Sequence, residues 1–149
     1  MRKLEIDIIE AKCYLYNDEF LRILARSMYQ PTPQRLQMRA NRYHNKPDSA
    51  VFAAIYQEHI CGIIVADIVS LHSITILDVA VAETMEHRGI GKAMILHLID
   101  EYHPVEIYAQ TDEAAVGFYR RIGFEVSQAE EKYKGVTRYN CIYPCNYME

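Results

Sequence analysis

The sequence has no hydrophobic run long enough to cross a membrane. Charged or polar residues interrupt every apolar stretch before it reaches the roughly 18 residues that a spanning helix needs. The start, MRKLEIDIIE, has the basic residues of a signal peptide, but Glu5, Asp7 and Glu10 interrupt the segment that would have to be hydrophobic. We therefore expect no membrane attachment and interpret this segment as the first strand.

The sequence also lacks the paired spacings that bind metals. Its four cysteines, Cys13, Cys61, Cys141 and Cys145, include no CxxC pair, and its six histidines show neither HxxxH nor HxH spacing. We expect no bound metal and four free thiols in a reducing cytoplasm. A zinc site built from Cys141, Cys145 and a histidine is the weaker alternative.

Basic residues are too few for general binding to nucleic acid. The 16 Lys and Arg against 20 Asp and Glu give a net charge of −4, whereas phosphate backbones are bound through a basic surface. We therefore expect no nucleic-acid partner, and the charge leaves room for a cationic acceptor. Arg35, Arg39 and Arg42 recur at helical spacing, which we interpret as a solvated helix face, with an acidic acceptor or partner as the alternative.

Repeats, low-complexity tracts and linkers are absent too, so we expect a single domain over residues 1–149, half of them hydrophobic. Hydrophobic periodicity predicts the order β, α, α, β, β, β, α, β, α, β, β, a mixed α/β fold with a central antiparallel stretch. The expected helix caps are Asn17 or Asp18, Thr32, and Asp112, with Gly123 as the left-handed end of the last helix. The predicted strands cover residues 3–9, 50–56, 61–69, 73–81, 105–109, 124–126 and 136–143.

The most informative segment runs from Val79 to Lys92, VAVAETMEHRGIGK, where a strand passes through a polar turn into a glycine-bearing helix start. The first turn of a helix leaves backbone amides unpaired and carries about half a positive charge. Glycines there let the backbone approach a phosphate closely. The segment therefore predicts a cradle for an anion such as a pyrophosphate.

Two other phosphate loops do not fit this segment. A P-loop requires Gly at position 86 and Ser or Thr at position 93, where this chain has Glu86 and Ala93. A dinucleotide-binding loop requires a third glycine at position 94, which is Met94, and an acidic residue at the end of a following strand, which is missing. Both are excluded.

The segment resembles the acetyl-CoA loop of the GNAT acetyltransferase superfamily, which has a strand valine, a short turn, Gln or Arg, two residues, Gly, any residue, and Gly or Ala. Val81, Gly89 and Gly91 fall at the matching intervals. A second stretch, TDEAAVGFYRRIGF at residues 111–124, resembles the family's Asn-x-x-Ala-x-x-Phe-Tyr-x-x-x-Gly-Phe signature. The resemblance covers residues 50–124 in motifs and in the order of elements.

Two positions depart from the family pattern. Glu86 stands where the family has Gln or Arg, which places a carboxylate near the pyrophosphate, and we expect Arg88 and Lys92 to compensate its charge. Asp112 replaces the leading Asn of the second signature. These departures are also compatible with a cofactor site whose sequence has diverged from that of the active enzymes.

The resemblance implies the GNAT fold, a mixed and mostly antiparallel central sheet flanked by helices and splayed between the fourth and fifth strands. It also implies an acetyl-CoA-dependent N-acetyltransferase that moves an acetyl group to a primary amine by direct transfer. In this family the backbone of Val79, Ala80 and Val81 would bind the pantetheine arm, which Asp112 would help to seat. The residues implied at the pyrophosphate are His87, Arg88, Gly89, Ile90, Gly91 and Lys92.

The resemblance also implies catalytic roles. Tyr119 is implied near the sulfur of the cofactor, as general acid for the departing CoA thiolate. The amide of Val79 is expected to stabilise the oxyanion. A base must take the proton of the ammonium before the amine attacks, and we expect Asp78 in this role, with Asp67 as the second candidate.

The acceptor and the assembly stay open at this point. A protein N-terminus or a lysine is the alternative to a small amine, and a non-catalytic acyl-CoA-binding module is an alternative of a different class. A homodimer is also open. Acceptor specificity is expected in the first two helices and the C-terminal strands, which carry no motif that identifies a substrate.

Overall fold

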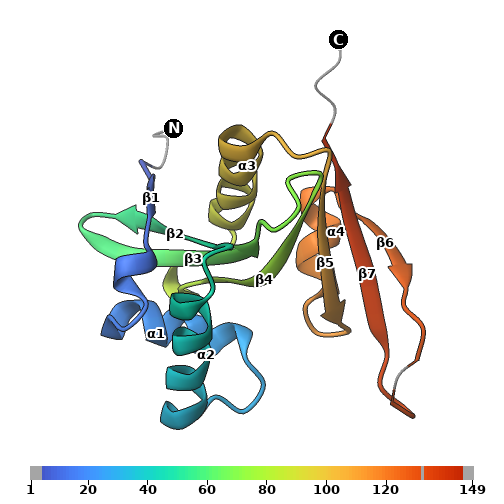
Figure 1. Cartoon of the computed structure of the whole chain (residues 1–149), viewed down its shortest axis with the longest axis horizontal. Coiled ribbons are helices and arrows are strands. Elements are labelled where there is room, and N and C mark those ends of the chain that lie inside the picture. Colours follow the sequence, from blue (N-terminus) through green and yellow to red (C-terminus); the bar gives the residue numbers. More distant parts are fainter. Residues whose placement is uncertain (1–4, 132, 146–149) are drawn as a thin grey trace.

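In the computed structural model, which describes residues 5–131 and 133–145, the strands form one sheet in the order β1-β2-β3-β4-β5-β7-β6 (Figure 1). Every neighbouring pair is antiparallel except β4 with β5, which are parallel. The predicted mixed and mostly antiparallel sheet is therefore confirmed. The strands are β1 Asp7–Glu10, β2 Ser49–Tyr56, β3 His59–Asp67, β4 Ser73–Val81, β5 Glu106–Asp112, β6 Glu125–Gln128 and β7 Arg138–Pro144.

The helices cover both faces of this sheet. They are α1 Asp18–Leu24, α2 Pro33–Asn45, α3 Ile90–Tyr102 and α4 Val116–Ile122, with short 3-10 turns η1 Lys12–Tyr14, η2 Ala25–Ser27 and η3 Glu83–Met85. Apart from these turns, the order of elements is the predicted one. The first strand begins at Asp7 rather than at residue 3, and residues 3 and 4 lie outside the described part of the chain. Helix α1 ends at Leu24 and continues as η2.

Three of the predicted caps are confirmed and one is wrong. Asn17 accepts the amides of α1, Thr32 accepts the Arg35 amide at 3.1 Å, and Gly123 ends α4 in the left-handed conformation. Asp112 instead ends β5, and its carboxylate accepts the amide of Ala115 at 2.9 Å, one residue before α4 begins. The strand is longer than predicted and leaves Asp112 in the turn.

Two hydrophobic cores lie on the two faces of the sheet. Alternate residues of a strand point to opposite faces, so Phe52 and Ala54 join the core under α3 and α4, whereas Val51 and Ala53 join the core under α1 and α2. Figure 1 shows α3 on one side of the sheet and α1 and α2 on the other. The β2–β3 hairpin is therefore buried on both faces and anchors the domain.

A bulge in β4 changes which face Asp78 occupies. Ile76 pairs with Ala66, but the next pair along β4 joins Asp78 to Val65, so Leu77 is an extra residue. Regular alternation would place Ile76 and Asp78 on the same face. Because of the bulge, Ile76 packs in the core under α3, whereas the Asp78 side chain faces α1 and α2.

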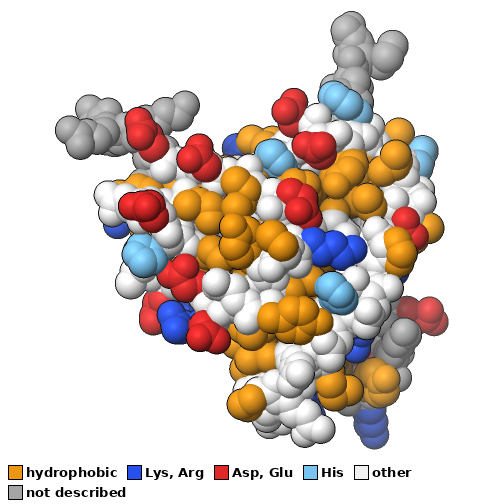
Figure 2. Space-filling model, turned by 60° about the vertical axis from the view of Figure 1, so that its left-hand side comes forward, with side chains coloured by type: hydrophobic (Ala, Val, Ile, Leu, Met, Phe, Trp, Pro, Cys, Tyr) orange, Lys and Arg blue, Asp and Glu red, His pale blue; other side chains and the backbone are white. Residues whose placement is uncertain are grey.

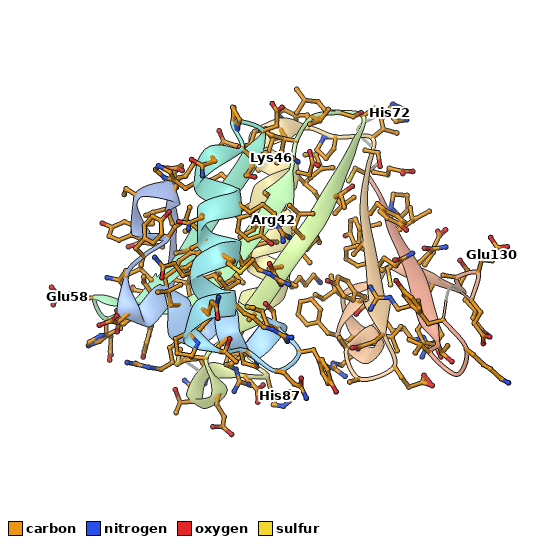
Figure 3. All side chains as sticks on the ribbon, turned by 60° about the horizontal axis from the view of Figure 1, so that its bottom comes forward. Arg42, Lys46, Glu58, His72, His87 and Glu130 are labelled. Carbon is orange, nitrogen blue, oxygen red and sulfur yellow. The ribbon has the colours of Figure 1, made fainter. Side chains whose placement is uncertain are left out.

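The sheet splits between β4 and β5. These strands pair only over Ser73–Thr75 with Glu106–Tyr108, after which β4 continues beside β3 and β5 beside β7. Figure 3 shows them together near His72 and separated at the end marked by His87. The predicted splay between the fourth and fifth strands is confirmed.

The surface carries mixed charge. On the face in Figure 2, hydrophobic side chains gather near the middle and acidic side chains are scattered around them. None of the helices formed by residues 5–131 and 133–145 is both long enough and apolar enough to cross a membrane.

Candidate active site

The splay opens into a cleft of about 1060 Å³. Its walls come from β4, the segment after α1, the start of α3, α4, and the adjoining ends of β5 and β7. Arg88 is the one predicted cofactor residue that does not line it, and Asp67 is also outside. The predicted residues that line the cleft are Asp78, Val79, Ala80, Val81, His87, Gly89, Ile90, Gly91, Lys92, Asp112 and Tyr119.

Six consecutive backbone amides at one end of the cleft are unpaired. The first hydrogen bond of α3 runs from the Ala93 amide to the Gly89 carbonyl at 3.0 Å, and the amides of residues 87–92 find no acceptor within the described parts of the chain. The helix that follows has 13 residues, and its dipole adds partial positive charge at this end. This end of the cleft can therefore bind an anion through backbone groups.

The two glycines of this loop are required for different reasons. Gly89 has a φ of 81°, a conformation that side chains disfavour, although a Cβ there would meet no atom within 4 Å. At Gly91 a Cβ would lie 2.4 Å from the ring of Phe118. Sequence reasoning explained both glycines by the approach of a phosphate; the packing of Phe118 is a further reason at Gly91.

The edge of β4 offers backbone groups to the cleft. The Ala82 amide bonds the Cys61 carbonyl of β3 at 2.8 Å. Since backbone groups of successive residues alternate in direction along a strand, Val79 and Val81 direct theirs away from β3 and into the splay. The Val81 carbonyl accepts a hydrogen bond from Arg26 Nε at 2.9 Å.

Arg26 forms an ion pair with Glu86. Its Nη2 lies 2.7 Å from Glu86 Oε2, and both side chains are partly exposed. The expectation that Arg88 and Lys92 would compensate Glu86 is therefore wrong, because neither forms an ion pair with it in the described residues. Arg26 comes from η2, 60 positions earlier in the chain, so spacing within the loop gave no sign of it.

Tyr119 lies at the floor of the cleft with its ring held on two sides. The side chain is 6% exposed, and its ring packs edge-on against Phe118 and Phe124, with centroids 5.1 Å away in both cases. No group in the described residues forms a hydrogen bond with its hydroxyl. Burial, followed by the nearby Cys141 and Asp78, raises the pKa of Tyr119 well above its usual range, so the hydroxyl is protonated at neutral pH.

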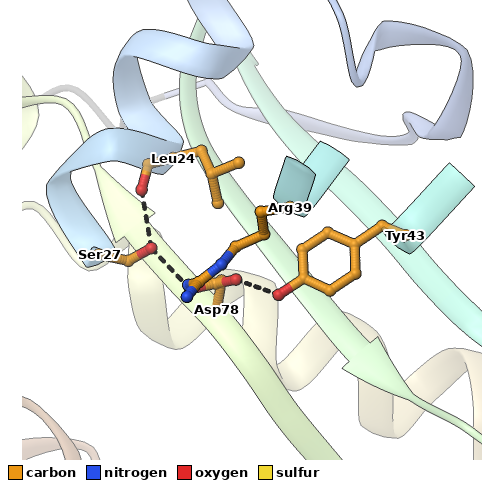
Figure 4. A network of polar contacts seen from close by, with 5 residues as sticks. All are labelled: Leu24, Ser27, Arg39, Tyr43 and Asp78. Carbon is orange, nitrogen blue, oxygen red and sulfur yellow. Dashed lines mark hydrogen bonds and ion pairs between the residues drawn. The ribbon is translucent and has the colours of Figure 1, made fainter. Parts of the chain in front are cut away.

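Asp78 is buried in a network that joins β4 to α1 and α2 (Figure 4). Its Oδ1 accepts from Arg39 Nη1 at 2.8 Å, and its Oδ2 accepts from the Tyr43 hydroxyl. Ser27 Oγ lies 2.8 Å from Asp78 Oδ1 and 2.8 Å from the Leu24 carbonyl, so its one proton serves one of the two oxygens at a time. Burial, followed by the Asp78 charge, raises the pKa of Tyr43 far above its usual range.

The second candidate base is held elsewhere. Asp67 Oδ2 lies 2.6 Å from Lys46 Nζ, and the hydrogen bond from Lys46 lowers the pKa of Asp67. It has no access to the cleft. Of the two carboxylates considered from sequence, only Asp78 lines the cleft.

The arginine stripe of α2 is not uniformly solvated. Arg35 bonds the exposed carbonyls of Tyr29 and Gln30, and Arg42 is exposed, but Arg39 turns into the cleft and pairs with Asp78. The solvated-face interpretation is therefore wrong for Arg39. Sequence reasoning missed two cleft residues near it, Arg26 and Ser27, and it also missed Tyr43, which bonds Asp78 from outside the lining. Tyr43 lies one helical turn after Arg39, which is the sequence sign of this network.

The fold and this cleft define an α/β protein whose splayed sheet opens an amide-lined site. Residues 14–124 match the model of the acetyltransferase (GNAT) family, more than half of the chain. The chain belongs to the GNAT acetyltransferase family, as the two motifs suggested. None of the curated proteins matches the sequence.

Several solved structures share this fold. An aminoglycoside 6'-N-acetyltransferase in complex with coenzyme A is 14% identical, with a TM-score of 0.80 over 98% of this chain and 99% of that one. Ard1 from Thermoplasma volcanium is 20% identical, with a TM-score of 0.68 over 95% and 98%. The ribosomal-protein-S18-alanine N-acetyltransferase from Escherichia coli is 14% identical, with a TM-score of 0.66 over 97% of each chain.

Proposed function

We propose that this protein is an acetyl-CoA-dependent N-acetyltransferase that moves an acetyl group directly onto a primary amine. The observation that carries the proposal is the run of unpaired amides at residues 87–92, beside the free edge of β4. A pyrophosphate attached to a long amide-bearing arm fits both features, because the amides bind phosphate oxygens and the strand edge binds peptide-like groups.

The lining residues fit acetyl-CoA. Val79, Ala80 and Val81 would hold the pantetheine arm, with Asp112 at its end, and the ion pair of Arg26 with Glu86 removes the repulsion that a free carboxylate would exert on a pyrophosphate. Acetyl-CoA supplies the acetyl group as a thioester. The proposed pyrophosphate residues are His87, Gly89, Ile90, Gly91 and Lys92, together with the exposed Arg88, which does not line the cleft.

The residues at the centre of the cleft can carry the transfer. The Val79 amide, directed into the splay, is the proposed donor to the oxygen that becomes negative. Tyr119, protonated and without a protein partner for its hydroxyl in the described residues, is the proposed acid for the leaving sulfur. We propose that the ammonium proton passes to Ser27 Oγ as the Ser27 proton passes to Asp78 Oδ1, since both oxygens of Asp78 already accept protein donors.

Peptide amines are the alternative acceptors. The structures of Ard1 and of the ribosomal-protein-S18-alanine acetyltransferase share this fold, and the latter is named for a protein acceptor. A non-catalytic acyl-CoA-binding module is the second alternative, which Glu86 and Asp112 suggested. Because Arg26 pairs with Glu86 and offsets its charge, Glu86 is compatible with a functional cofactor site, which favours the enzyme over the non-catalytic module.

Two measurements on the full chain test the proposal. Calorimetric titration with acetyl-CoA should show micromolar or tighter binding. Thiol release should then exceed the background rate with at least one amine from a panel of amino acids, polyamines, aminoglycosides and peptides. Lys46→Gln, outside the cleft, is a matched control that should bind acetyl-CoA as the unmodified chain does. Absence of binding would refute the cofactor, and binding without any turnover would favour the non-catalytic module.

A further inference from the structure

The wall formed by β5 and β7 has two different faces. Ala109 and Cys141 are buried in the core under α3 and α4. By alternation along the strands, Gln110 and Arg138 lie on the opposite face, which is the face that carries α1 and α2. The hydrogen bond from Gln110 Nε2 to Asn140 Oδ1 at 3.3 Å joins two residues of that same face. Arg138 therefore lines the cleft from the face of the sheet that also carries α2, the helix of Arg39.

Two of the three carboxylates that line the described cleft are paired with arginines. Asp78 accepts from three protein groups, and Glu86 is paired with Arg26. Asp112 accepts the Ala115 amide and forms no ion pair with Arg138, its neighbour across the strands. A polycationic acceptor would therefore find only one carboxylate here without a cationic partner, Asp112, which is the residue proposed to seat the pantetheine arm.

Cations are in excess in the same cleft. Within residues 5–131 and 133–145, Lys92, Arg121 and Arg138 line it without an ion-pair partner. Lys92 lies in the first turn of α3 and Arg121 in α4, which together form the proposed cofactor side. Arg138 is half-buried at the start of β7, opposite Asp112, and belongs neither to the loop of residues 87–92 nor to α4, so the proposed phosphate site does not account for it.

We propose that the acceptor is a small amine that also carries a carboxylate, and that Arg138 binds this carboxylate. The inference rests on the proposed function. The guanidinium of Arg138 has five N–H donors in a planar fork that matches a carboxylate. Arg39, which also lines the cleft, bonds Asp78 through Nη1 and has further N–H donors besides that bond. This arrangement admits an amino acid and disfavours polyamines and aminoglycosides.

The test compares each ω-amino acid with its carboxamide, because the amine lies far from the changed group and keeps a similar pKa. Thiol release should give a kcat/KM ratio of acid to carboxamide of about tenfold or more, as expected for a charge-assisted hydrogen bond. Arg138→Gln should reduce this ratio about tenfold. Arg138→Lys, which keeps the charge and loses the fork, should give an intermediate ratio and decides the matter if the Gln variant does not fold. Lys134→Gln, exposed and outside the cleft, is the control.

The outcomes separate this inference from the proposed function. An acid preferred over its carboxamide, with the preference lost in Arg138→Gln and kept in Lys134→Gln, supports the inference. Turnover of polyamines or carboxamides at rates equal to those of the acids, or an unchanged ratio in Arg138→Gln, overturns it while leaving the acetyltransferase function in place. Acetyl-CoA binding without turnover of any amine overturns both.

Discussion

The two ends of the cleft are built in different ways. At the proposed cofactor end, the groups that face the cleft are backbone groups within one segment of the chain, those of Val79, Val81 and residues 87–92. At the proposed acceptor end they are side chains from separate elements, and Asp78 contacts Arg39 across 39 positions and Ser27 across 51. A site made of the backbone of one segment has a sequence pattern that can be recognised. A site assembled by tertiary contacts can use residues at many different positions, so its sequence does not identify the ligand.

The largest effect is expected at Gly91, where the cofactor end depends on an absent side chain. Gly91→Glu should abolish acetyl-CoA binding by filling the cradle. Because a Cβ would press on Phe118, it should also lower the free energy of unfolding by about 1–3 kcal/mol. Calorimetry and thermal unfolding measure the two effects.

A double variant separates these two reasons for the glycine. Gly91→Ala combined with Phe118→Ala should be destabilised by less than the sum of the single changes, because the clash is removed. A strictly additive result would mean that Phe118 does not explain Gly91. Normal binding in Gly91→Glu would remove the cradle itself.

The next effect concerns Tyr119, at the junction of the two ends. Tyr119→Phe keeps the ring between Phe118 and Phe124 and loses the hydroxyl, so kcat should fall by about 10²–10⁴-fold, towards the lower figure, with little change in the melting temperature. Tyr143→Phe, whose ring also packs on Phe124 but lies outside the cleft, should keep the full rate. Equal single-turnover rates in Tyr119→Phe and the unmodified chain would make Tyr119 a structural aromatic.

Sequence reasoning succeeded where the signals are local. The element order follows from hydrophobic periodicity and caps such as Asn17 and Thr32, and the cofactor loop follows from its glycines. Sequence could not show that a bulge at Leu77 turns Asp78 to the other face, because a bulge depends on how two strands pair. Arg26 was missed because its partner, Glu86, is 60 positions away.

At the acceptor end, Asp78→Asn should produce a moderate and divided effect. The loss of the charge that holds Arg39 should cost about 1–3 kcal/mol of stability and raise KM for the amine, with acetyl-CoA affinity nearly unchanged. If Asp78 receives the proton, the acidic limb of kcat/KM against pH should disappear. Persistence of that limb would leave Asp78 as a residue that only positions Arg39 and Tyr43.

A smaller effect is expected at Arg26, which bonds Val81 and Glu86. Arg26→Gln should weaken acetyl-CoA binding several-fold, because Glu86 would then face the pyrophosphate without its partner. Stability should change by less than about 1 kcal/mol, since both side chains are exposed to solvent. The double variant with Glu86→Gln should recover the affinity, and failure to recover it would assign Arg26 a direct role in binding instead.

The smallest effect is expected at Asp67. Asp67→Asn should leave turnover unchanged, because Asp67 lies outside the cleft, and any loss of kcat/KM would reopen its role as base. Lys46 lowers the pKa of Asp67, so the pair stabilises the fold above the unfolded value of about 3.9 and the contribution is lost as pH falls through the lower folded value. Acid unfolding of Asp67→Asn should show this difference, at most about 1 kcal/mol.

Amide hydrogen exchange with and without acetyl-CoA tests most directly whether the cleft between β4 and β5 is the acyl-CoA site. The unpaired amides of residues 87–92 and those of Val79 and Val81 should exchange more slowly once acetyl-CoA is added. The paired amides of the β2–β3 hairpin should not change. Protection confined to other segments, with residues 79–81 and 87–92 unaffected at saturating acetyl-CoA, would contradict the account.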